Sequence, residues 1–382
     1  MVMLDLEPRF KRNLQSWMMN SNGGNMGRRR SRTGHIPACR LSVVDTFPAL
    51  SVKPDRGPLQ DITSGLSFTF YNTSCPRLET IIRSQLRIVI QNNSREAAGL
   101  LRLHFHDCFV QGCDGSVLLD GSASGPGEKN APPNRSLRPE AFVIIEDLRR
   151  RVHAACGQVV SCTDIVALAA RDSVVLTGGR NYRVPLGRRD GTNFATIEQV
   201  LNDLPFPQGK VTDLLPFFLS RNLSLTDMVA LSGAHTIGVS NCSSFRERLY
   251  PNQDFTMNLT FATALRGICP TNVSTNGTVL DIQTPRRFDN RYYANLVNRQ
   301  GLLNSDQDLF TDARTSALVA TYARSQGRFF QQFALSMIKM GQINVLTGTQ
   351  GEIRANCSAR NAGTTTTMIE VDGDDQEEIA TY

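Results

Sequence analysis

The chain has 382 residues, of which 40% are hydrophobic and 20% are charged, and its formal net charge is +6. This composition is ordinary for a globular protein, and the length allows one large domain or two lobes around a cleft. The charge is small and, outside residues 28–32, evenly spread, so we expect no nucleic-acid partner. No apolar run approaches the roughly 18 residues that a membrane-spanning helix needs, so we expect no membrane span.

The two ends of the chain differ from its middle. Residues 1–64 are rich in Lys, Arg and Asn and contain no clear signal peptide, so we expect a poorly ordered N-terminal extension. Residues 359–382 include an acidic stretch and are expected to form a disordered acidic C-terminal tail. Residues 65–358 have the pattern of one globular domain.

The nine cysteines say more than the overall composition about the compartment in which the protein folds. Eight lie in the patterned region and one, Cys39, lies in the extension. Four disulfides and a spare thiol would imply an oxidising compartment, whereas reduced, buried cysteines in a cytosolic enzyme are the alternative. Glycosylation sequons also favour secretion, and those at exposed-looking positions begin at Asn72, Asn92, Asn222, Asn258, Asn272 and Asn276.

The first part of the patterned region indicates helices. Ser74 is a candidate cap with Pro76 in the first turn, and apolar residues from Leu78 to Ile90 form one helix face. Helical composition resumes at Glu96. The Gly- and Pro-rich residues 121–139 predict a long loop.

The rest of the region is also mostly helical in pattern. Helices are predicted at 142–155, 163–176, from a capping box at 224–227 toward residue 233, and at 288–299, 314–325 and 329–340. Residues 182–190 are expected to be a short strand or extended, 250–285 to be loop-rich, and Gly301 to follow a helix end. The pattern therefore predicts a mainly α fold with little β structure.

The segment 101–119 gathers an arginine, two histidines, two aspartates and two cysteines. At 3.6 residues per turn, Arg102 and His106 share one helix face, whereas His104 points to the other side, into the core. A guanidinium beside an imidazole indicates a proton acceptor next to a fixed positive charge.

The loop that follows this helix supplies hard oxygen ligands. Asp107, Asp114 and Ser116 lie in a glycine-containing loop that a bond between Cys108 and Cys113 would close. Oxygen ligands of this kind favour calcium over zinc. The segment therefore predicts catalysis at its helical end and metal binding at its loop end.

Histidine is scarce, with five in the chain. His35 lies in the extension, and His153 lies among arginines on a helix expected to be solvated. His106 and His235 remain as candidates for chemistry, and the small residues of Gly-Ala-His-Thr-Ile-Gly around His235 allow a flat group to approach. The alternative is that both are hydrogen-bonded core histidines.

Together these motifs resemble those of the secretory plant haem peroxidases (class III). Residues 101–119 are similar to the distal motif of that family, and Val229-Ala-Leu-Ser-Gly-Ala-His-Thr-Ile-Gly is similar to its proximal motif. Val184-Pro-Leu-Gly-Arg-Arg-Asp-Gly and Phe288-Asp-Asn-Arg-Tyr-Tyr match further segments. The resemblance implies a two-lobed, mainly α haem peroxidase fold, with one haem b between a distal and a proximal helix.

The resemblance also implies a role for each matching residue. His106 would be the distal acid–base group, Arg102 its partner in peroxide activation, and Asn134 the hydrogen-bond partner of His106. His235 would be the axial iron ligand, and Asp306 would accept its other ring proton. By position alone, Asn134 would be an ordinary loop residue and Asp306 a turn or helix-end residue.

Two calcium sites are implied as well, together with a substrate contact. The distal site would use Asp107, Asp114, Ser116, the backbone oxygens of Val110 and Gly112, and Glu128 through water. The proximal site would use Thr236, Asp281, Thr284 and Asp289, with a backbone oxygen near Arg287. Solvated acidic loops are the alternative, credible for Asp281 alone but poor for the whole set. Pro205 matches a position that lines the reducing-substrate site, and a plain loop proline is an equal alternative.

Eight cysteines allow 105 pairings, and the resemblance to the family implies one of them. The implied pairs are Cys75–Cys156, Cys108–Cys113, Cys162–Cys357 and Cys242–Cys269. Cys39 has no counterpart and is left free.

The implied activity is an H2O2-dependent oxidation of small phenolic donors, in one-electron steps through a high-valent iron-oxo intermediate. We expect a monomer in the extracellular space (the cell wall) or the vacuole. One rival is a disulfide-stapled, calcium-binding protein that has lost the reaction, and the intact set of site residues argues against it. The other is an intracellular ascorbate-type peroxidase, which lacks this eight-cysteine framework.

Overall fold

The computed structural model describes residues 62–121 and 125–361. This part of the chain contains twelve α-helices and one small sheet, which confirms the predicted mainly α fold. The helices are α2 (Leu78–Asn92), α3 (Arg95–Phe109), α4 (Pro139–Cys156), α5 (Cys162–Leu176), α6 (Ile197–Asp203), α7 (Val211–Leu219), α8 (Leu225–Ser232), α9 (Leu259–Ile268), α10 (Arg291–Val297), α11 (Asn304–Thr311), α12 (Ser316–Arg324) and α13 (Gln326–Met340). Strands β1 (Val239–Asn241) and β2 (Gly277–Val279) pair antiparallel, with Val239 opposite Val279.

Most of the expected N-terminal extension and acidic tail lies outside the described residues. His35 and Cys39 fall in that part, so the predictions made for them stay predictions.

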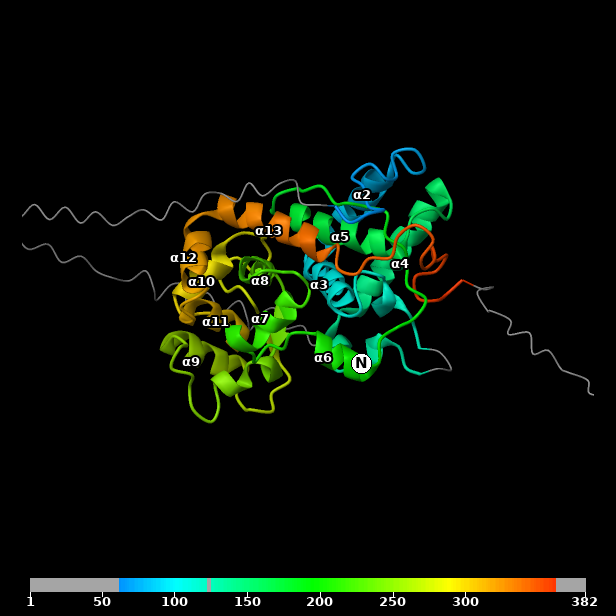
Figure 1. Cartoon of the computed structure of the whole chain (residues 1–382). Coiled ribbons are helices and arrows are strands. Elements are labelled where there is room, and N and C mark those ends of the chain that lie inside the picture. Colours follow the sequence, from blue (N-terminus) through cyan, green and yellow to red (C-terminus); the bar gives the residue numbers. More distant parts are fainter. Residues whose placement is uncertain (1–61, 122–124, 362–382) are drawn as a thin grey trace, which may run out of the picture. The chain divides into compact units, whose positions relative to one another are not determined.

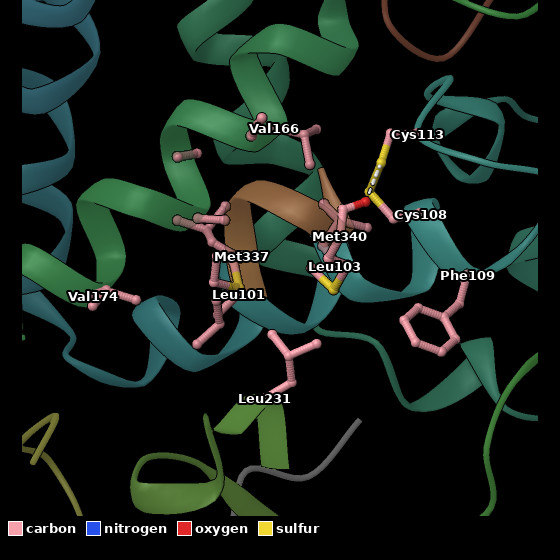
Figure 2. Packing of buried hydrophobic residues seen from close by; sticks show 14 of the residues in the cluster. Leu101, Leu103, Cys108, Phe109, Cys113, Val166, Val174, Leu231, Met337 and Met340 are labelled. Carbon is pink, nitrogen blue, oxygen red and sulfur yellow. Dashed lines mark hydrogen bonds between the residues drawn. A yellow bond between two sulfur atoms is a disulfide. The ribbon is translucent and has the colours of Figure 1, made fainter. Parts of the chain in front are cut away.

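Helix α3 lies against α5, with α2 and α4 beside the pair (Figure 1). Figure 2 shows Leu101 and Leu103 of α3, Val166 of α5, and Met337 and Met340 of α13 as members of one hydrophobic cluster. All five side chains are buried. This apolar contact fixes the rotation of α3 about its axis, and with it the direction in which the polar residues of α3 point.

Local sequence signals set the helix ends that matter for the site. The Ser161 hydroxyl caps α5 by accepting a hydrogen bond from the backbone nitrogen of Asp164 at 3.1 Å. At α8, Ser224 accepts from the backbone nitrogen of Asp227, and Asp227 accepts from that of Ser224 at 2.9 Å. This is the predicted capping box, and α8 leads into the 3₁₀ turn Gly233–Thr236 that carries His235.

The start predicted for the first helix is wrong. Helix α2 begins at Leu78 with Arg77 at its N-cap, and no side chain caps it. Ser74 and Pro76 instead belong to turns in which the backbone nitrogen of Cys75 donates to the backbone oxygen of Tyr71. Cys75, in the middle of these turns, is also bonded to Cys156 at the end of α4.

Three further differences concern elements that the pattern missed or misplaced. Residues 250–285 are not only loop, because they contain α9, capped by the Asn258 side chain, and β2. Helices α6 and α7 were not predicted, although Thr196 and Gln199 form a capping box at α6. The helix predicted at 288–299 is the shorter α10, and Gly301 does not end it, since Arg299 takes the left-handed conformation at φ 59°.

Residues 182–190 are extended, as predicted. They form isolated bridges that pair Leu186 with Ser67, Arg189 with Leu346 and Asp190 with Glu352.

Four disulfides cross-link the described residues, and they are the four pairs that the family resemblance implies. They join Cys75 to Cys156, Cys108 to Cys113, Cys162 to Cys357 and Cys242 to Cys269. Two of them span long stretches of chain, with sequence separations of 195 and 81 residues, so they restrict the unfolded chain most. The bond between Cys108 and Cys113 closes the loop directly after α3.

Candidate active site

His106 on α3 faces Asn134, which lies in the 3₁₀ turn Asn134–Ser136. Nδ1 of His106 is 2.6 Å from Oδ1 of Asn134, and both side chains are buried. The Asn134 amide nitrogen donates to the backbone oxygen of Glu128 at 2.9 Å, so the amide oxygen must be the atom that faces His106. Nδ1 of His106 therefore carries the proton, and Nε2 keeps the lone pair that a general base needs.

The charge state of His106 follows from its surroundings. Burial and then the positive charge of Arg102 lower the pKa of His106 to about 3, while the hydrogen bond with Asn134 acts in the opposite direction. The imidazole is therefore neutral near pH 7. Burial lowers the pKa of Arg102 to about 10, which leaves the guanidinium charged.

Arg102 also ties α3 to the loop that carries Asn134. Its guanidinium donates to the backbone oxygen of Ser136 at 2.8 Å and to that of Pro133 at 3.2 Å. The Ser136 hydroxyl lies 3.0 Å from the same guanidinium. The structure thus brings Arg102, His106 and Asn134 together, and the acceptors at Pro133 and Ser136 are contacts that the sequence pattern did not reveal.

His235 lies in the turn directly after α8, and its Nδ1 is 2.7 Å from Oδ1 of Asp306. Asp306 is in the first turn of α11, where its Oδ2 accepts from the backbone nitrogen of Leu303 at 3.0 Å. The Tyr292 hydroxyl donates to Oδ1 at 2.9 Å. A carboxylate that accepts from Nδ1 leaves Nε2 of the imidazole free for a metal and raises the basicity of that nitrogen.

Asp107, the residue after His106, has two buried carboxylate oxygens without a hydrogen-bond partner. Ser116 Oγ and Glu128 Oε2 are buried and unpartnered as well. Burial and then the negative charges of Asp114 and Glu128 raise the pKa of Asp107 well above its usual range. Burial also raises the pKa of Glu128 to about 7. Unpartnered buried carboxylates are costly in the absence of a cation, so this oxygen cluster fits calcium.

The backbone of the loop after α3 can supply two further oxygens to this cluster. The backbone oxygens of Val110 and Gly112 accept from the nitrogens of Gly112 and Asp114 at 2.8 and 2.9 Å, which leaves each a second lone pair. Gly112 has φ +135°, and a Cβ there would lie 2.6 Å from Cβ of Asn344. Only glycine fits this position.

A second oxygen cluster follows His235. Thr236 Oγ1 lies 3.1 Å from Asp281 Oδ2 and 3.5 Å from Asp289 Oδ1, and the backbone oxygen of Arg287 lies 3.4 Å away. Thr284 Oγ1 is 3.2 and 3.0 Å from the same two carboxylate oxygens. The two hydroxyl groups have one proton each for these three acceptors, of which Asp289 Oδ1 also accepts from the backbone nitrogen of Arg291 at 2.8 Å. Burial raises the pKa of Asp281, so this cluster also fits a cation.

The remaining candidates are placed as follows. Pro205 is half-buried in the loop between α6 and α7, and Pro207 of that loop accepts from the backbone nitrogen of Ser305, next to Asp306. His104 is buried on the packed side of α3 and lines a small cavity with Met337 and Gly341. Tyr292 is a contact of the site that the sequence reasoning missed, although it stands in the matched Phe288-Asp-Asn-Arg-Tyr-Tyr segment.

Comparison with known proteins identifies the relatives of this chain. The peroxidase family model matches residues 82–325. A cationic peroxidase, SPC4, of Sorghum bicolor is 60% identical over 308 residues, covering 80% of this chain and 85% of its own length. Peroxidase 12 of Arabidopsis thaliana is 56% identical over 327 residues, covering 86% of this chain and 91% of its own.

The chain belongs to the peroxidase family. More narrowly, its relatives are plant class III peroxidases. It is therefore an oxidoreductase, a haem peroxidase that uses H2O2 and oxidises reducing substrates. Its four disulfides fit an extracellular setting. Among the described helices, none is long and apolar enough to cross a membrane.

Proposed function

We propose that His106, Arg102 and Asn134 form the distal half of the peroxide site in this peroxidase, and that His235 and Asp306 form its proximal half. One observation carries the proposal. Nδ1 of His106 is hydrogen-bonded to the side-chain oxygen of Asn134, and Nδ1 of His235 to that of Asp306. Each imidazole therefore keeps its Nε2 free for chemistry. Haem b, when bound, supplies the iron at which H2O2 is reduced and the oxidising equivalents are held.

On the distal side, His106 takes the proton of the incoming peroxide on Nε2 and returns it to the oxygen that leaves as water. The neutral state of the imidazole makes the first of these transfers available over the physiological pH range. Arg102 stabilises the negative charge that develops on the leaving oxygen, and one preorganised donor of this kind is worth about 3 kcal/mol or more. Asn134 keeps Nδ1 of His106 protonated and fixes the plane of the ring.

On the proximal side, Nε2 of His235 would bind the iron. The hydrogen bond from Nδ1 to Asp306 gives the imidazole partial anionic character and makes it a stronger donor to the metal. Asp306 itself is held by the backbone of Leu303, so the acceptor is fixed before haem binds.

The two oxygen clusters would each hold one calcium ion. The distal ion would bind Asp107, Asp114, Ser116, the backbone oxygens of Val110 and Gly112, and Glu128 through water; the proximal ion would bind Thr236, Asp281, Thr284, Asp289 and a backbone oxygen near Arg287. Asp107 and Thr236 directly follow His106 and His235, so each ion would fix the backbone beside one working histidine.

Small phenols are the proposed reducing substrates, with Pro205 as a contact, and the enzyme would act as a monomer in the extracellular space or the vacuole. The domain would span residues 65–358. The loop of Pro205 is bonded to α11 beside Asp306, which supports a donor site close to the haem.

The test is reconstitution of the protein with haem and calcium, followed by an absorption spectrum and an assay with guaiacol and H2O2. We expect a Soret band and turnover. His235→Ala should lose the spectrum of five-coordinate haem, and an unchanged spectrum would exclude His235 as the ligand. A folded protein without a Soret band would favour the rival, a calcium-binding protein that has lost the reaction.

A further inference from the structure

The carboxylate of Asp306 accepts hydrogen bonds from other groups besides His235. Its Oδ1 accepts two hydrogen bonds, one from Nδ1 of His235 at 2.7 Å and one from the hydroxyl of Tyr292 at 2.9 Å. Its Oδ2 accepts from the backbone nitrogen of Leu303 at 3.0 Å. The tyrosine and the histidine therefore share one carboxylate oxygen.

We propose that Tyr292 sets how strongly Asp306 draws the proton of His235, and thereby sets how strongly His235 donates to the haem iron. A hydrogen bond donated to a carboxylate stabilises the anion, so the anion attracts a neighbouring proton less. With the Tyr292 hydroxyl in place, the Nδ1 proton stays more fully on His235 and the imidazole is less anionic. This inference rests on the proposed role of His235 as the iron ligand.

The surroundings of the Tyr292 hydroxyl favour its hydrogen bond to Asp306. Tyr292 and Asp306 are each 1% exposed, so water does not compete for the shared oxygen. A carboxylate oxygen can only accept, so the Tyr292 hydroxyl is the donor in this bond. The rings of His235 and Tyr292 meet edge to face with centroids 6.1 Å apart.

The next residue in the chain is a matched control. Tyr293 is also buried, and its ring packs on that of Tyr292 with centroids 5.0 Å apart. Its hydroxyl donates to the backbone oxygens of Val229 and Ala230, at 2.9 and 3.3 Å, and has no bond to Asp306. Replacing either tyrosine by phenylalanine removes one buried hydroxyl, but only one of these hydroxyls touches the carboxylate.

The experiment compares Tyr292→Phe and Tyr293→Phe as haem- and calcium-loaded proteins. The readouts are the iron–histidine stretching frequency of the ferrous protein and the Fe(III)/Fe(II) midpoint potential. For Tyr292→Phe we expect a higher frequency and a lower potential, with a shift in the reduction equilibrium of up to about tenfold, or ~59 mV. For Tyr293→Phe both values should stay near wild type. Asp306→Asn, with a weaker acceptor, should shift both in the opposite sense.

Equal shifts in the two tyrosine variants, or no shift in either, would overturn the inference. Wild-type protein without an iron–histidine band would instead overturn the proposed ligand, and the inference would fall with it. If Tyr292→Phe does not bind haem, 3-fluorotyrosine incorporated into Tyr293→Phe gives a second measurement. Its more acidic hydroxyl donates more strongly, so the frequency should fall, and an unchanged or higher frequency would contradict the inference.

Discussion

The amide oxygen of Asn134 lies 2.6 Å from Nδ1 of His106, although 28 residues separate the two in the chain. The bond is possible because Arg102, one helical turn before His106, holds the intervening loop through the backbone oxygens of Pro133 and Ser136. The three residues of the proposed distal site thus position one another.

Loss of the Asn134 amide should weaken His106 as a base. The hydrogen bond that Nδ1 of His106 donates to the amide oxygen of Asn134 raises the pKa of His106, against the effects of burial and of the charge of Arg102. In Asn134→Ala we therefore expect the reaction with H2O2 to slow by up to about tenfold for each pKa unit lost. Stopped-flow mixing with H2O2 measures this rate. Asn130→Ala, an exposed change in the same loop, should react at the wild-type rate, and a wild-type rate in Asn134→Ala would contradict the role of the amide.

Calcium removal should destabilise the protein. Without a cation, Asp107 keeps two unpartnered buried oxygens near the charges of Asp114 and Glu128. A ligand present at 100 times its dissociation constant stabilises the folded state by about 2.7 kcal/mol, so chelation should lower the midpoint of thermal unfolding and slow the peroxide reaction. Readdition of calcium is the control for irreversible damage.

Separate substitutions should distinguish the two calcium ions. Asp107→Asn and Asp289→Asn change carboxylates of different clusters, so each variant should bind one calcium ion, whereas the wild type should bind two. Metal analysis of the purified proteins measures the ratio. Two ions bound in either variant would contradict the assignment of that cluster.

The buried carboxylate of Asp227 should make stability depend on acid pH. Burial alone would raise its pKa, but hydrogen bonds from Ser224, Ser336 and Lys339 outweigh it and hold the pKa below its ordinary value of 3.8. The folded state thus binds this proton less tightly than the unfolded state, so the stabilisation is full above pH 3.8 and is lost as the pH falls through the lower folded pKa.

Asp227→Asn tests this coupling. At pH 7 the variant should be less stable by about 1.5–3 kcal/mol, the contribution of hydrogen bonds to a charged group. Below pH 3.8 the difference from wild type should shrink. Urea unfolding at pH 7 and below pH 3.8 measures the difference in unfolding free energy between the variant and the wild type. A difference independent of pH would show that the charge of Asp227 contributes nothing to stability.

Glycan mapping provides an independent test of the distal site. Asn134 begins an Asn-Arg-Ser sequon, yet it is 3% exposed and both atoms of its amide are hydrogen-bonded. Active enzyme from a plant cell should therefore carry no glycan at Asn134, whereas the exposed Asn92 and Asn222 are available. A glycan at Asn134 in active enzyme would contradict its place beside His106.

Several features that depend on local sequence were predicted, although the capping box of α6 was missed. The shared face of Arg102 and His106 follows from helical phase, and the capping box of Ser224 and Asp227 follows from spacing. Asp306 and Asn134 were found only through the family resemblance, because contacts between distant residues leave no local pattern. Tyr292 was missed for the same reason. The cap predicted at Ser74 was wrong because the residues before Leu78 form turns, in which the backbone nitrogen of Cys75 bonds to the backbone oxygen of Tyr71.

The rate of the first reaction with H2O2 in His106→Ala is the sharpest test of His106 as the acid–base group. His104→Ala, which changes a histidine on the opposite side of the same helix, is the control. We expect His106→Ala to keep its haem and to react about 10²–10⁴-fold more slowly than wild type, since positioned acid–base groups contribute this much. A normal, rapid reaction of haem-loaded His106→Ala with H2O2 would show that His106 is not the acid–base group.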